Sequence, residues 1–83
     1  MNKQEQEQYS EKVMKRISRN LKRLREKRGW TQYRVAEMTG LAWHTIQKWE
    51  FGYNCPKVDK LLWLCRCTGW KLSDVLGGGK TDE

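Results

Sequence analysis

The chain has 83 residues, a net charge of +7 and a sequence pI near 9.6, and 33% of its residues are charged. This length fits one domain with a modest core and leaves too little chain for a substrate pocket. We expect no transmembrane helix and no signal peptide, because no apolar run approaches ~18 residues and the N-terminal MNKQEQEQYS has no apolar segment.

The positive charge is concentrated in one segment. Residues 12–28 contain nine Lys or Arg against a single Glu, and the rest of the chain is close to neutral. Such a run is either a solvated helix face or a source of electrostatic attraction for a polyanion, and the two interpretations are compatible.

The N-terminal part of the chain predicts a tail and one helix. Residues 1–9 are polar and rich in Gln and Glu, so we expect a flexible tail that is disordered or weakly helical. Ser10 is the candidate N-cap of the first helix, and Gly29 ends it. One apolar stripe at helical spacing lies between them, formed by Val13, Ile17, Leu21 and Leu24.

Residues 31–50, TQYRVAEMTGLAWHTIQKWE, predict two short helices joined by a tight turn. Thr31 is the N-cap of a helix that extends to Met38, and Gly40 can adopt the left-handed conformation of the turn. A further helix runs from Trp43 to Glu50. This is the pattern of a helix-turn-helix, in which the second helix enters the DNA major groove.

Two more short helices are expected after a loop at residues 51–56, FGYNCP. One runs from about residue 57 to 68 and the other from about 72 to 76. The inward face of the first of these is predicted to contain Val58, Leu61, Leu62 and Cys65. Three glycines follow, and residues 77–83 are expected to form a second flexible tail. With no strand signal, the sequence predicts an all-α domain of five helices at residues 10–76.

From Ile17 to Leu76 the chain resembles the DNA-binding domain of phage repressor and Cro proteins, also called the XRE or Cro/C1-type family. The resemblance is carried by ISRNLKRLREKRGWTQ, by the helix-turn-helix, by WEFG after it and by LLWLCRCTGWKLSDVL. It implies the compact five-helix bundle of this family. It also implies a DNA-binding regulator of transcription, expected to be a repressor, in the cytoplasm of a bacterium or encoded by a phage and associated with the nucleoid.

The resemblance assigns roles to individual positions. Those that face the bases are Trp43, His44, Gln47 and Lys48. Those expected at DNA phosphates are Gln32, Arg34, Thr45, Tyr53, Asn54 and Lys57. Arg25 and Glu50 match a structural ion pair, although two ordinary surface charges are the alternative.

This sequence departs from the family pattern at two kinds of position. Ala42, Lys57 and Lys71 replace the usual N-cap residues of the last three helices. Trp43 is an unusual side chain for the start of a recognition helix. It either packs on a thymine methyl or a sugar, or folds back on the protein.

The expected partner is double-stranded DNA, bound by a homodimer on a two-fold operator with half-sites ~34 Å apart. The candidate dimer interface is Trp63, Cys67 and Trp70. In the alternative, Trp70 belongs to the core and the N-terminal helix covers Trp63. A possible protein partner defines a second functional hypothesis, in which the fold serves as an antitoxin or adaptor module.

We expect no metal, no cofactor and no enzymatic activity. The three cysteines, an odd number, predict free thiols in a reducing cytosol. Cys55, Cys65, Cys67 and His44 lack the spacing of a zinc site. The sequence contains one His, no nucleophile motif and no phosphate-binding glycine loop.

Overall fold

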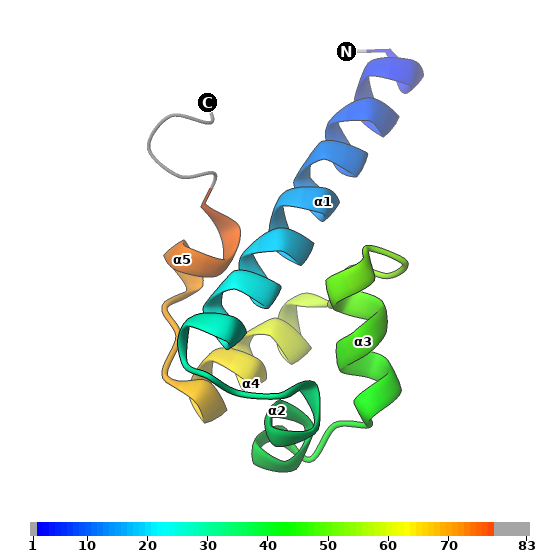
Figure 1. The fold of residues 1–83 in the computed structure, drawn as a ribbon. Coiled ribbons are helices and arrows are strands. Elements are labelled where there is room, and N and C mark those ends of the chain that lie inside the picture. Colours follow the sequence, from blue (N-terminus) through cyan, green and yellow to red (C-terminus); the bar gives the residue numbers. More distant parts are fainter. Residues whose placement is uncertain (1, 78–83) are drawn as a thin grey trace.

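The computed structural model describes residues 2–77 and, within them, contains five helices and no strand. In chain order they are α1 (Lys3–Lys27), α2 (Gln32–Thr39), α3 (Trp43–Phe51), α4 (Val58–Thr68) and α5 (Leu72–Leu76). The predicted all-α fold of five helices is confirmed. Figure 1 shows α1 as the longest element, with α2 and α3 on one side of its C-terminal half and α5 on another.

The predicted start of α1 at Ser10 is wrong, because the helix begins at Lys3. Asn2 is the N-cap: its side chain accepts a hydrogen bond from the Glu5 amide at 2.8 Å, and the Glu5 carboxylate accepts one from the Asn2 amide at 3.2 Å. This reciprocal capping box satisfies two of the donors that a helix N-terminus exposes. The expected flexible tail at residues 1–9 is therefore helical from Lys3 onward, and all of residues 2–12 are exposed. The expected C-terminal tail lies, after Gly77, outside the described residues.

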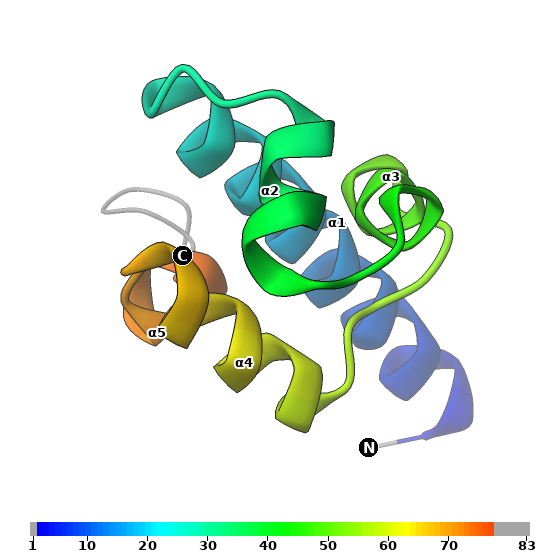
Figure 2. The same cartoon turned by 90° about the horizontal axis from the view of Figure 1, so that it is seen from below.

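The core is formed where the C-terminal half of α1 meets the other helices. α1 packs against α3 and α5, while α2 packs against α3 and α4. Figure 2 shows α2 between α3 and α4, with α1 crossing behind them. The buried apolar side chains are Ile17, Leu21, Leu24, Val35, Ile46, Trp49, Leu61, Leu64, Trp70 and Val75.

The predicted inward face of α4 is correct at two of its four positions. Leu61 is buried and Cys65 packs partly buried against the core, as predicted, and Leu64 is buried beside them. Val58 and Leu62 are largely exposed instead. The side of α4 with Val58 and Leu62 and the side with Leu61 and Leu64 are both apolar at helical spacing. The position of α2 therefore decides which side is covered. α4 therefore leaves part of its apolar surface in solvent.

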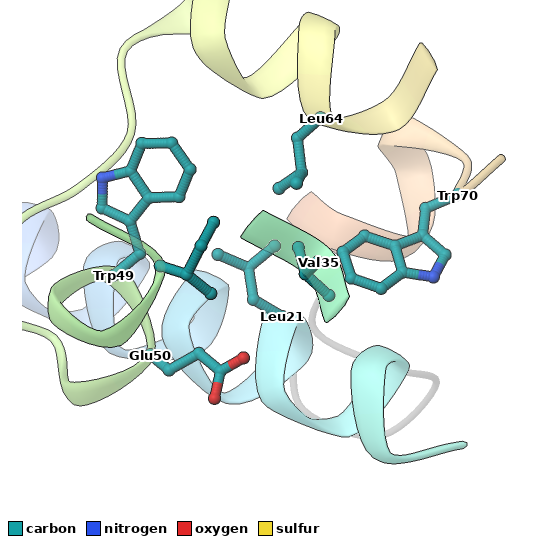
Figure 3. A pocket seen from close by; sticks show the side chains of 7 residues that line it. Leu21, Val35, Trp49, Glu50, Leu64 and Trp70 are labelled. Atoms are coloured by element: carbon teal, nitrogen blue, oxygen red, sulfur yellow. The ribbon is translucent and has the colours of Figure 1, made fainter. Parts of the chain in front are cut away.

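A small cavity lies at the centre of the core. Figure 3 shows Leu21, Val35, Trp49, Leu64 and Trp70 around it, with the Glu50 carboxylate at its edge. Its volume is about 10 Å³, which is about the space needed by a single water molecule. This cavity is too small for an organic ligand.

Candidate nucleic-acid interface

α2, the turn at Gly40 and α3 form the helix-turn-helix. The Thr31 hydroxyl accepts a hydrogen bond from the Arg34 amide at 3.0 Å and so caps α2. Gly40 ends α2 with φ of 73°, a left-handed conformation that is costly for residues with a side chain. The N-cap of α3 is Ala42, whose side chain cannot accept a hydrogen bond, so α3 has no side-chain cap, as the sequence implies. The turn therefore has the conformation that its glycine predicts.

α3 has a buried face and an exposed face. Ile46 and Trp49 point into the core, whereas His44 and Lys48 are exposed on the opposite side. Gln47 and Thr45 are half-buried at the boundary between the two faces. The geometry thus presents one amide, one ammonium and one imidazole group from a rigid helix, which are the groups that can hydrogen-bond base edges.

An ion pair between Arg25 and Glu50 joins α1 to the end of α3. Arg25 Nε and Nη2 donate to the two Glu50 carboxylate oxygens at 2.7 and 3.0 Å. Arg25 Nη1 also donates to the Trp30 carbonyl at 2.8 Å. The hydrogen bond with Glu50 raises the pKa of Arg25, and burial opposes this shift. The two side chains are 12% and 5% exposed, so the pair is shielded from solvent and fixes the orientation of α3 relative to α1.

Gln32, the first residue of α2, connects this ion pair to the start of α3. Its Nε2 donates to Glu50 at 3.0 Å, and its Oε1 accepts from Trp43 Nε1 at 3.2 Å. A carboxylate can only accept and an indole N–H can only donate, so these partners fix which way the amide points. One N–H of Gln32 remains at the N-terminus of α2, where the helix dipole favours an anion.

Trp43 folds back on the protein, which is the alternative left open by the sequence. Besides its bond to Gln32, its ring stacks on Tyr33 with centroids 5.0 Å apart and planes 8° apart. The His44 ring meets Trp43 edge-on at 4.7 Å. The polar atom of Trp43 is therefore engaged within the protein, and one face of its ring is covered by Tyr33.

The remaining phosphate candidates lie at two places on the surface. Arg34 is exposed on α2 and pairs with Glu37 at 2.8 Å, an exposed pair of little energetic weight. Tyr53, Asn54 and Lys57 are exposed in the segment that connects α3 to α4. That segment follows the recognition helix directly, so these side chains lie next to its C-terminal end.

The three residues of the candidate dimer interface do not share one exposed face. Trp70 is buried in the core and Cys67 is half-buried. Trp63 is 46% exposed, and its Nε1 donates to the Thr39 carbonyl at the end of α2 at 2.7 Å. Of the three, Trp63 alone offers a large exposed surface.

Two residues that the sequence analysis did not single out also have a role: Tyr33 lies at the candidate interface, and Asn20 stabilises the packing of α5 on α1. Tyr33 is exposed and stacks on Trp43. Its position beside Gln32 in the N-terminal turn of α2 is the sequence feature that could have indicated its place at the interface. Asn20 is buried and donates from Nδ2 to the carbonyls of Val75 and Gly77 at 2.7 and 2.6 Å. These bonds hold α5 on α1, and a polar residue within an apolar helix face was the signal for them.

The described residues contain no group of three His, Cys, Asp or Glu side chains placed to hold a metal ion. Burial raises the pKa of both Cys55 and Cys65, which makes these thiols less reactive than a free cysteine. Within residues 2–77, no helix has the length and apolar character needed to span a membrane.

These features define a helix-turn-helix DNA-binding protein, with one face of α3 in the core and a polar face in solvent. A protein-family model described as helix-turn-helix matches residues 21–75, which is more than half of the chain. The chain belongs to the XRE family of helix-turn-helix DNA-binding regulators, as its resemblance indicated. No curated protein and no solved structure matches the chain. The matched region begins within α1, so the first turns of this helix precede it.

Proposed function

We propose that this protein is a sequence-specific transcriptional repressor that binds a two-fold DNA operator as a homodimer in the cytoplasm. The observation that carries the proposal is the polar face of α3, where His44, Gln47 and Lys48 are presented beside two buried anchors, Ile46 and Trp49. A helix held in this way can enter the major groove without losing its packing on the core.

The exposed groups of α3 suit particular base edges. Lys48 can donate to guanine O6 and N7, and the Gln47 amide can pair with adenine N6 and N7. His44 can donate or accept, depending on its tautomer. Each good pair of hydrogen bonds contributes ~1–3 kcal/mol of discrimination.

Phosphate contacts would set the register of α3 on the duplex without reading sequence. Gln32 is suited to this role because its amide is already oriented by Glu50 and Trp43. Tyr53, Asn54 and Lys57 would contact the backbone from the segment that follows α3, and Thr45 on α3 and Arg34 on α2 would add contacts from their own helices. The basic segment at residues 12–28 adds a long-range field that accelerates association and makes it salt-dependent.

Selection of bound sequences from a randomised duplex library, followed by sequencing, tests the proposal. We expect a two-fold motif with half-sites about one helical turn, ~34 Å, apart. The control is the doubly substituted variant Gln47→Ala/Lys48→Ala, which retains the basic segment and should bind without enriching any motif. Enrichment of the same motif by this variant, or none by the parent protein, would contradict base reading by α3.

A protein-interaction module, such as an antitoxin or adaptor, is the second candidate. It is favoured by the apolar surface that α4 leaves in solvent at Val58, Leu62 and Trp63. Exposed apolar clusters of this kind mark contact surfaces for proteins. If the library selection retains no DNA, this second function becomes the better supported one.

A further inference from the structure

A row of four basic side chains runs along α1. All four are exposed, and no acidic residue occurs within residues 12–25. They form the basic stripe, which consists of Lys12, Lys15, Arg19 and Lys22. Their spacing of three, four and three residues places them on one side of a helix with about 3.6 residues per turn.

The basic stripe lies on the side of α1 that faces away from the domain. At about 100° per residue, its centre is roughly opposite the buried side chains of Ile17, Leu21 and Leu24. α3 and α5 lie along other sides of α1 (Figure 1), which they contact through Arg25 and Asn20. The packing of the five helices therefore leaves the stripe in solvent.

The charges of the basic stripe are not neutralised by the rest of the fold. Among residues 2–77, none of its four side chains makes an ion pair or a hydrogen bond. Like charges three and four residues apart on a helix repel each other. A polyanion bound along this side of α1 would relieve that repulsion, and the four donors are free to contact it.

The surroundings of the basic stripe favour a nucleic acid over a membrane or a protein. The same side of α1 includes Gln8, Arg16, Arg23 and Glu26 and no apolar residue. A helix that binds a membrane surface inserts apolar side chains, and the centre of a protein interface is depleted of charge. The stripe has neither feature, so its partner should be recognised through regularly spaced negative charge alone.

The length of the basic stripe matches the phosphate spacing of duplex DNA. Lys12 and Lys22 are ten residues apart in one helix, which corresponds to ~15 Å along its axis. Each strand of B-DNA carries one phosphate per ~3.4 Å of its axis, so this length spans about four phosphates. The number of cations therefore equals the number of phosphates that one strand presents.

We propose that the basic stripe is a second DNA-backbone site, on which the protein holds a duplex other than the one bound by α3. None of the residues assigned above to operator contacts belongs to α1, so the stripe remains available when α3 is occupied. Phosphate contacts read no sequence, so any DNA segment can fill this site. The site does not depend on base reading by α3, although bridging two duplexes requires both surfaces.

The second site is expected to be weak and strongly dependent on salt. Four phosphate contacts give a slope of about −3.6 for log K against log [salt]. With a Kd of ~1 M at ~1 M salt as the reference, this slope gives a Kd of ~20 µM at ~50 mM salt and ~3 mM at ~200 mM salt. Bridging should therefore occur at low salt, or where two DNA segments are held at high local concentration.

Energy transfer between donor-labelled and acceptor-labelled duplexes tests the inference. Both duplexes have ~20 base pairs of one fixed sequence and are mixed with the full chain at ~50 mM salt. The parent should bring them together, and added salt should separate them. Lys12→Gln/Lys15→Gln/Arg19→Gln, the stripe variant, removes three contacts and keeps good helix formers at exposed positions. Its affinity for the second duplex should fall by about tenfold or more.

Lys3→Gln/Arg66→Gln/Lys71→Gln is the matched control, because it also removes two Lys and one Arg at exposed positions but leaves the basic stripe intact. It should bridge the duplexes nearly as well as the parent. The inference is overturned if the parent shows no energy transfer at ~50 mM salt. It is equally overturned if the stripe variant bridges as well as the control.

The library selection separates this inference from the proposed function. A recovered motif without stripe-dependent energy transfer would leave the proposed function standing and refute the second site. No motif, with stripe-dependent energy transfer, would refute base reading by α3 and leave the second site standing. If the stripe variant binds a recovered operator about tenfold more weakly than the control in fluorescence anisotropy, the stripe contacts the operator itself and the second duplex is refuted.

Discussion

Replacing Glu50 with alanine removes the acceptor that joins three helices. Its carboxylate accepts two hydrogen bonds from Arg25 and one from Gln32, at 2.7 to 3.0 Å. In Glu50→Ala the Arg25 guanidinium would keep the Trp30 carbonyl as a partner but lose its counter-charge. We therefore expect a marked loss of stability and a Gln32 Nε2 without its acceptor, while Gln32 Oε1 still accepts from Trp43.

The size of the loss follows from the burial of the pair. Breaking a buried ion pair by removing one partner costs ~3–5 kcal/mol. Because Arg25 is 12% exposed and keeps a carbonyl partner, we expect the lower end, ~3 kcal/mol. A chain of this size has a free energy of unfolding of ~4–12 kcal/mol, so much of its stability would be lost.

Urea unfolding followed by circular dichroism measures this change. With an m-value of ~1 kcal/mol/M, a loss of ~3 kcal/mol should lower the urea midpoint by ~3 M. Arg25→Met/Glu50→Leu replaces the pair by apolar side chains and should be more stable than Glu50→Ala. The reasoning is refuted if Glu50→Ala costs less than ~1 kcal/mol, the value of a solvent-exposed pair, or if the double variant is no more stable than the single one.

The pKa shift of Arg25 predicts how its contribution to the free energy of unfolding depends on pH. A basic group with a raised pKa stabilises the fold below its unfolded pKa, and this stability is lost as pH rises through the folded pKa. Arginine titrates above ~12 even when unfolded, and the Glu50 hydrogen bond raises the pKa of Arg25 further. The contribution of the Arg25 charge to the free energy of unfolding should therefore be the same throughout pH 6–9. The same urea titrations can cover this range.

Four further predictions concern the interface and its support. Lys48→Ala should relax preference at one base pair by ~1–3 kcal/mol, whereas Lys57→Ala should weaken binding to all sequences alike, as measured against an operator library. Trp43→Phe retains a ring to stack on its neighbour but loses the donor to Gln32, so it should reduce affinity less than Trp43→Ala and leave base preference unchanged. Asn20→Ala leaves two carbonyls without their donor and should lower the free energy of unfolding by ~2 kcal/mol in urea titrations. In a chain with Cys65→Ala and Cys67→Ala, the raised pKa of Cys55 should make alkylation at pH 8 slower in the folded protein than in urea.

Each of these predictions has an outcome that contradicts it. Equal loss of affinity at every sequence in both lysine variants would remove the distinction between base and phosphate contacts. A changed base preference in Trp43→Phe would make Trp43 a base-reading residue after all. An Asn20→Ala chain as stable as its parent would show that water replaces the lost donors, and equal alkylation rates would show that Cys55 is fully solvated.

The sequence also contained a signal for the N-terminal extension of α1. Asn2 followed three residues later by Glu5 is the pattern of a capping box, and the structure begins the helix there. Ser10 is an equally good N-cap residue, so local chemistry gave two candidate starts. Gln and Glu are good helix formers, and the helix therefore continues through the residues that separate the two starts.

Apart from the start of α1, the sequence by itself determined the helices, the turn at Gly40 and the family, because helical periodicity and left-handed glycines act over a few residues. The tertiary structure alone decided that Val58 and Leu62 remain in solvent while Trp70 enters the core. It also decided that Trp43 turns back to Tyr33 and Gln32. These outcomes depend on which surfaces α2 and α3 cover and where an indole N–H finds an acceptor, and both are set by contacts between residues distant in the chain.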